Sequence, residues 1–141
     1  MKGIKKMGYV YAGGKTNQQI HAKAKIGESN QKYLSSRIGK IRNDEGNFVV
    51  FEYLEIPNST KAITRSIEGD VRLMMERAGY KNIQNDHFIW ETTRENKMED
   101  YKRFSHLAIQ FAMAYCDFRG IPYIHHIANG KARKTVKKRK K

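Results

Sequence analysis

The chain of 141 residues has the length of one domain with a short appendage, and it is too short for two independent catalytic domains. Lys and Arg number 28 against 14 Asp and Glu, which gives a formal net charge of +14. Hydrophobic residues make up 39% and aromatic residues 11%, so the chain can bury a core and is not disordered throughout.

The C-terminal segment 131–141 carries eight of the positive charges and no acid, which leaves 20 minus 14, or +6, on the remainder of the chain. A basic body with a more basic tail predicts a polyanionic partner, most simply nucleic acid, because each Lys or Arg that neutralises a phosphate releases counterions. We interpret the tail as a disordered segment that holds a phosphate backbone without reading bases. Its basic residues are Lys131, Arg133, Lys134, Lys137, Lys138, Arg139, Lys140 and Lys141.

No apolar run is long enough to span a membrane, and the basic start is followed by glycines and polar residues instead of the apolar stretch of a signal peptide. We therefore expect a soluble, cytoplasmic protein without a membrane partner. Cys116 is the single cysteine, so it cannot close an intramolecular disulfide. It stands in an apolar stretch, which predicts a small core residue.

The N-terminal third predicts two strands and a helix. Residues 7–12 mix tyrosine and valine and stop at Gly13-Gly14, which is typical of a strand ending in a turn. A second strand fits residues 22–27. Residues 31–42 have apolar side chains at helical spacing and predict the first helix.

The middle of the chain predicts a strand followed by a helix. Residues 48–56 are rich in β-branched and aromatic side chains, and Pro57 ends them. Apolar residues then recur every three or four positions over 63–78. Ser59 or Thr60 can cap this helix, and Gly79 is a C-terminal stop.

The last third predicts a further extended segment at residues 87–91 and a long helix over 98–118 with Asn96 as its cap. Aromatic residues repeat along this helix, and we expect it to pack on the body rather than to pair with a second copy. A homodimer is nevertheless left open. Residues 121–128 form a short apolar piece before the tail.

Four features follow one another in the first half of the chain. The first strand contains Gly-x-Val-Tyr, the second ends in Lys-Ile-Gly, the next helix carries an arginine, and the following helix carries a glutamate beside its apolar stripe. The residues are Gly8, Val10, Tyr11, Lys25, Ile26, Gly27, Arg37 and Glu68.

This set, in this order, resembles the GIY-YIG nuclease superfamily, and most of all its phage and mobile-element branch, in which the second motif reads KIG. The resemblance covers roughly residues 7–91. It implies an α+β fold with a small three-stranded antiparallel sheet flanked by helices. Residues 1–95 would form the nuclease-like domain, 96–130 a C-terminal helical extension and 131–141 the tail.

The resemblance also implies a function: a metal-dependent endonuclease that cuts or nicks DNA, most simply duplex, with one divalent ion such as Mg²⁺. Tyr11 would position or deprotonate the attacking water, Arg37 would contact the scissile phosphate, and Glu68 would be the only metal-binding carboxylate. Such an enzyme would act for a phage or mobile element, in homing or against a competitor genome, in the bacterial cytoplasm near the nucleoid.

Lys25 stands where many members of the superfamily have a second tyrosine. A lysine there could bind phosphate or lower the pKa of Tyr11 by its charge. Tyr9 alternates with Tyr11 and so shares its face, which leaves open which of the three activates water. Asn85 or His87 could supply a further polar group near the last strand.

Elementary chemistry supports these residue types. The transition state of phosphodiester hydrolysis concentrates negative charge on oxygen atoms, so a fixed guanidinium and a metal ion stabilise it more than the ground state. Magnesium keeps water and phosphate oxygens among its ligands, so one glutamate can suffice.

Each residue also has an ordinary structural explanation. Glu68 could be a solvated charge at the edge of a helix, Arg37 could pair with Asp70, and the two tyrosines could be normal strand residues. The alternatives to an enzyme are a DNA-binding protein that keeps the nuclease fold without cleavage and a basic RNA-binding protein.

Overall fold

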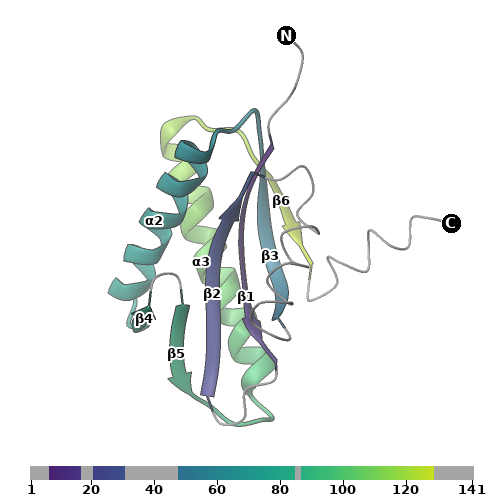
Figure 1. Ribbon diagram of the computed structural model, residues 1–141, viewed down its shortest axis with the longest axis vertical. Helices are drawn as coiled ribbons and strands as arrows, with labels where there is room; N and C mark the ends of the chain where they lie inside the picture. The colour runs from purple at the N-terminus through teal and green to yellow at the C-terminus, as the bar shows by residue number, and fades with distance from the viewer. Residues whose placement is uncertain (1–6, 17–20, 31–47, 85–86, 129–141) are drawn as a thin grey trace, which may run out of the picture.

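The computed structural model describes residues 7–16, 21–30, 48–84 and 87–128, without the side chains of 82–84. In these residues the fold is α+β: six strands form one antiparallel sheet in the order β4-β5-β2-β1-β3-β6, and two helices pack on it (Figure 1). In chain order the elements are β1 (Met7–Lys15), β2 (His21–Ser29), β3 (Phe48–Pro57), α2 (Lys61–Arg77), β4 (Asn82–Gln84), β5 (His87–Glu91), α3 (Lys97–Arg119) and β6 (Ile124–Ile127).

The expectation of a three-stranded sheet is wrong, because strands add to both sides of the central β2-β1-β3 unit. β5 pairs with β2 and carries β4 beyond it, while β6 pairs with β3. Half of the apolar piece predicted at 121–128 is thus a strand. Its sequence, Ile-His-His-Ile, has no strong β pattern, and its pairing depends on β3, which lies far earlier in the chain.

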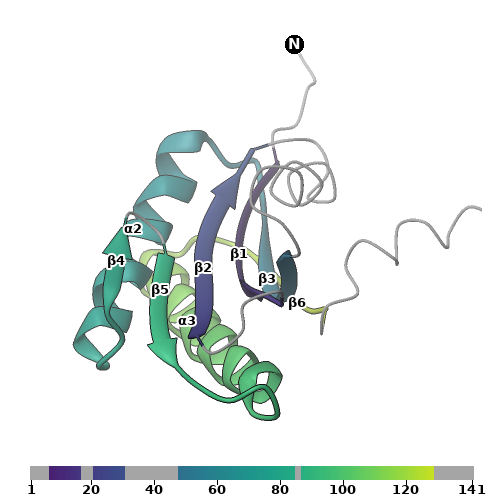
Figure 2. The ribbon, with the colours of Figure 1, turned by 60° about the horizontal axis from the view of Figure 1, so that its bottom comes forward.

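Both helices cover the same face of the sheet (Figures 1 and 2). Side chains that point to this face, such as Val10 and Leu54, share the main core with Ile67 of α2 and Phe104 of α3. The alternate residues of the strands point to the other face. There a smaller cluster gathers around Tyr9, Tyr11, Phe48 and Val50.

The cap, the end and the buried stripe of helix α2 are those predicted from the sequence. The Thr60 side chain accepts a hydrogen bond of 3.3 Å from the backbone N–H of Ile63, which confirms the cap. Gly79 follows the helix with φ of +108°, a conformation that glycine adopts at little cost. The helix buries Ile67, Val71 and Met75, so its apolar stripe is the one predicted.

Helix α3 packs on the sheet, as expected, and its residues enter the same core as β1 and β3. Asn96 occupies the cap position but makes no capping bond with its side chain; instead its N–H donates to the Thr93 hydroxyl at 3.1 Å. Cys116 is buried in the core, and desolvation raises the pKa of its thiol to about 11. The thiol is therefore neutral and unreactive in the folded protein.

The prediction of a turn at Gly13-Gly14 is wrong, since β1 continues to Lys15. The glycines serve close packing instead. A Cβ at Gly13 would lie 1.9 Å from the carbonyl oxygen of Val49, and one at Gly14 would lie 2.3 Å from the Tyr101 ring. The Tyr101 hydroxyl then accepts from the N–H of Lys23 at 2.9 Å and donates to the Lys15 carbonyl, which joins α3 to the ends of both strands.

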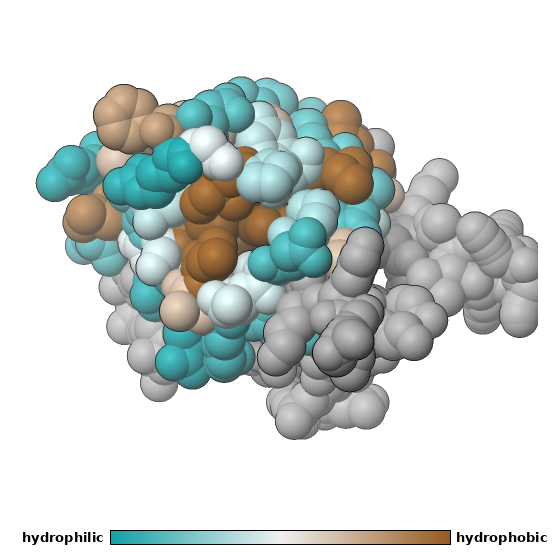
Figure 3. All heavy atoms as spheres, turned by 90° about the horizontal axis from the view of Figure 1, so that it is seen from above, coloured by the Kyte–Doolittle hydropathy of each residue, from teal (hydrophilic) through white to brown (hydrophobic). Residues whose placement is uncertain are grey.

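Among the described residues few large apolar side chains are exposed. The most exposed of these is Phe118 at 88%, near the end of α3. At the end of the molecule where β3 leads into α2, apolar groups form a compact patch enclosed by polar residues (Figure 3). Neither described helix is long and apolar enough to cross a membrane.

Candidate active site

Tyr11 and Gly27 lie directly opposite each other on β1 and β2, so the two sequence motifs meet at one level of the sheet. A Cβ at Gly27 would lie 2.3 Å from the Tyr11 hydroxyl oxygen and 2.4 Å from Cζ, so the glycine leaves the space that the phenol occupies. The Phe48 ring meets the Tyr11 ring edge-on, with centroids 6.2 Å apart. The glycine of the second motif therefore helps to position the tyrosine of the first.

Lys25 and Tyr9 lie on the same face as Tyr11. Lys25 stands two residues before Gly27, so its side chain leaves the sheet on the same side. Tyr11 is 0%, Lys25 5% and Tyr9 7% exposed. The structure thus brings the three candidate water-activating residues together, but in a part of the face that is closed to solvent.

Glu68 lies in the helix layer, where it is half-buried on α2. Its neighbours Ile67 and Val71 pack into the core that lies against the opposite face of the sheet. The structure therefore does not bring Glu68 onto the face of Tyr11 and Lys25.

The helix that carries Glu68 and the strand that carries Gly27 contact each other at the C-terminal end of β2. β5 pairs with β2 only from His21 to Lys25, and no other described strand adjoins residues 26–29 on that side. Helix α2 packs on β2 and runs beside this stretch (Figure 1). Because residues four apart on a helix are neighbours on its surface, Glu68 lies next to Thr64, whose hydroxyl bonds to Glu28 of β2 at 2.9 Å. This contact joins the helix that carries Glu68 to the strand that carries Gly27.

The sequence analysis missed Glu28, which follows Gly27 directly. Its side chain is 11% exposed and pairs with Lys61 at 3.3 Å and with Arg65 at 3.9 Å. The Thr64 hydroxyl also lies 3.2 Å from Asn30 Oδ1. This polar cluster ties the end of β2 to the start of α2. Its members come from distant parts of the chain, so no local pattern reveals their contacts.

Three histidines bond to carboxylates of β3, which the sequence analysis also missed. Glu52 is buried and contacts both His106 of α3, at 2.9 Å, and His125 of β6, at 2.8 Å. On the other face His126 Nε2 lies 2.9 Å from Glu55 Oε1. The contacts of His125 and His126 attach β6 to β3 on both faces of the sheet, and that of His106 attaches α3 to β3.

Several candidates lie outside the described residues: Arg37 with its helix, Asn85, and all eight basic residues of the tail. Their roles stay predictions. His87 is described and pairs with Lys25 across β5 and β2, so it lies on the face of Tyr11.

A divalent ion is compatible with Glu68. The residue is partly exposed, so the waters that Mg²⁺ retains can reach it, and its helix neighbour Thr64 carries a hydroxyl oxygen, a kind of donor that this ion accepts. Across the described ranges no three His, Cys, Asp or Glu residues form a group that could hold a metal. Glu68 remains the candidate protein ligand.

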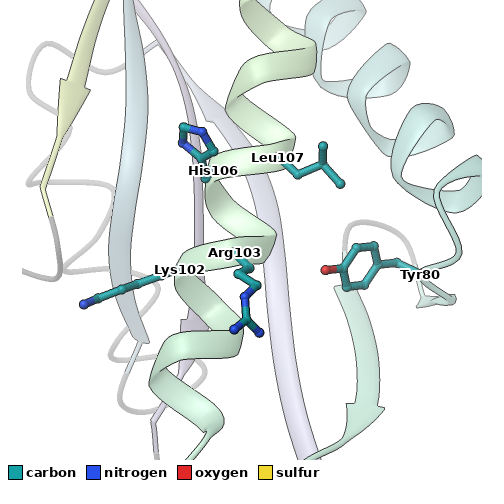
Figure 4. A pocket seen from close by; sticks show the side chains of 5 residues that line it. All are labelled: Tyr80, Lys102, Arg103, His106 and Leu107. Atoms are coloured by element: carbon teal, nitrogen blue, oxygen red, sulfur yellow. The ribbon is translucent and has the colours of Figure 1, made fainter.

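A pocket of about 470 Å³ lies elsewhere, on the outer side of α3. It is lined by Tyr80, Lys102, Arg103, His106 and Leu107. Tyr80 and Leu107 lie on one side of the helix, and Lys102 extends from the other (Figure 4). The pocket contains none of the predicted site residues.

A scan against protein-family models gives no match, and searches of curated proteins and of solved structures find no significant similarity either. The candidate site is therefore defined by its residues and by their arrangement.

Proposed function

We propose that the protein is a metal-dependent DNA endonuclease. The observation that carries the proposal is the direct pairing of Tyr11 with Gly27, with Lys25 beside them on the same face. The tyrosine belongs to one motif and the glycine to the other, and the glycine leaves the space in which the tyrosine ring is held.

In the proposed reaction a water oxygen attacks phosphorus, and the bond from phosphorus to the leaving oxygen breaks. Tyr11 orients the water as a phenol, or as a phenolate takes its proton and later returns it to the leaving oxygen; the positive charge of Lys25 would offset the cost of a buried phenolate. Arg37 binds the equatorial phosphate oxygens. Glu68 would hold the divalent ion, which supplies further charge stabilisation.

A second function, DNA binding without cleavage, is favoured by one observation. Tyr11 and Lys25 are closed to solvent, so they can act on a phosphate only if DNA binding opens this face. Incubation with supercoiled plasmid and Mg²⁺ separates the two functions. Conversion to open circles supports the endonuclease, whereas complete binding of the plasmid without any nicking supports the second function.

Removal of residues 131–141 is expected to weaken DNA binding and to flatten its salt dependence. If the eight basic residues of the tail neutralise about six phosphates, the slope of log K against log salt falls by roughly five, at 0.9 per contact. Fluorescence anisotropy on duplex DNA at several salt concentrations measures both slopes. A full-length variant with the eight residues changed to Gln is the matched control, and it should behave like the truncated chain. An unchanged slope would contradict a role of the tail in phosphate binding.

A further inference from the structure

The face that carries Tyr11 continues across β3 to an aromatic pair on β6. Tyr11 is opposite Tyr53, and Tyr53 is opposite His126, so the three side chains leave the sheet in the same direction. The Tyr53 and His126 rings are stacked, with centroids 4.6 Å apart and an interplanar angle of 17°. Tyr9 meets Tyr53 edge-on at 6.3 Å.

The stacked pair is held in place and reaches solvent. The Glu55 carboxylate bonds to His126 Nε2 at 2.9 Å, which restrains rotation of the imidazole. The His126 side chain is 36% exposed and that of Glu55 26%, and Tyr53 is half-buried. Tyr11 and Tyr9, by contrast, are buried. On its β3–β6 side this face is therefore accessible beside the buried tyrosines.

Partly exposed, restrained aromatic rings on a sheet face are suited to stacking with nucleobases. Bases in a duplex are already stacked on their neighbours, whereas unpaired bases offer their faces to aromatic side chains. The chain continues from β6 into residues 131–141 with their eight basic residues, only a few positions after His126. Proteins that bind single strands combine these two features, aromatic stacking and positive charge.

His126 is too distant to act on the same phosphate as Tyr11. The two residues are separated by two strand spacings, roughly 10 Å. The pair is therefore suited to holding a neighbouring part of the strand and not to catalysis.

We propose that Tyr53 and His126 form a stacking surface for unpaired bases of single-stranded DNA next to the candidate active site. The choice of DNA rests on the proposed function. It implies that the strand to be cut is bound beside an unpaired region.

The test measures binding of a labelled single strand of about ten nucleotides by fluorescence anisotropy in EDTA, so that cleavage plays no part. Tyr53→Leu and His126→Leu are each expected to weaken binding roughly 5- to 150-fold, the effect of losing one stacked base. Tyr53→Phe keeps the ring and should bind within threefold of wild type. Binding to a duplex of the same length should change less than threefold in all variants.

His125→Leu is the matched control, because His125 is the adjacent residue of β6 but bonds to Glu52 on the opposite face. It perturbs the attachment of β6 without touching the stacked pair, so it should retain single-strand binding. A loss as large in His125→Leu as in His126→Leu would overturn the proposal, as would unchanged binding in Tyr53→Leu or an equal loss on duplex. Tighter binding of an RNA strand with the same bases would overturn the assignment to DNA. Since EDTA suppresses cleavage, selective single-strand binding can be found even if the protein never cuts.

Discussion

Replacement of Glu68 by alanine is expected to lower the rate of DNA cleavage roughly 100- to 1,000-fold, the usual effect of removing one electrostatic contact to a transition state. Arg37→Ala should have an effect of the same size. Alanine is a better helix former than glutamate, so α2 should keep its structure in the Glu68 variant. Rates of plasmid nicking under single-turnover conditions, together with DNA affinity measured without metal, separate lost chemistry from lost binding.

The matched control for this experiment is Glu76→Ala, which removes the same side chain from an exposed position two turns further along α2. It should cleave at the wild-type rate. Wild-type cleavage by the Glu68 and Arg37 variants would show that the site has been assigned to the wrong residues.

Gly27→Ala is expected to lower the free energy of unfolding by about 1–3 kcal/mol or more, as overpacking of a core does. The new methyl group would lie 2.3 Å from the Tyr11 hydroxyl oxygen, and the ring is fully buried. Urea denaturation measures the loss. The double variant with Tyr11→Leu should recover part of it, because the shorter side chain vacates this space.

Gly69→Ala is the control for the glycine experiment. A Cβ at Gly69 meets nothing within 4 Å, and alanine is favoured over glycine inside a helix by about 1 kcal/mol. The same substitution should therefore stabilise the protein in α2 and destabilise it in β2. If the Gly27 variant were as stable as wild type, Gly27 would not be needed to leave space for the Tyr11 ring.

Patterns of neighbouring residues in the sequence predicted α2, α3 and β3. The spacing of apolar residues and the signals at Thr60 and Gly79 located α2 almost to the residue, since a helix makes its hydrogen bonds within one segment. The extent of α3 was likewise correct within one residue at each end. β3 was predicted because β-branched and aromatic residues fill a buried strand.

The features that the sequence did not reveal depend on distant partners. Gly13 and Gly14 are typical of a turn, and only the approach of Val49 and Tyr101 explains why they lie within a strand. The histidines of β6 form hydrogen bonds with Glu52 and Glu55 of β3, and this role can be recognised only when the pairing of the two strands is known. For the candidate site, strand alternation predicted that Tyr9 and Tyr11 share a face, but not that Lys25 lies there too or that α2 carries Glu68 in the opposite layer.

We propose above all that the protein hydrolyses DNA with a divalent ion. The most direct measurement is the nicking rate of supercoiled plasmid by the full chain as the Mg²⁺ concentration is raised from zero in EDTA. We predict no nicking in EDTA and a rate that increases with Mg²⁺ until it saturates. Fully bound plasmid that stays supercoiled at every Mg²⁺ concentration, or nicking that persists unchanged in EDTA, would contradict the claim.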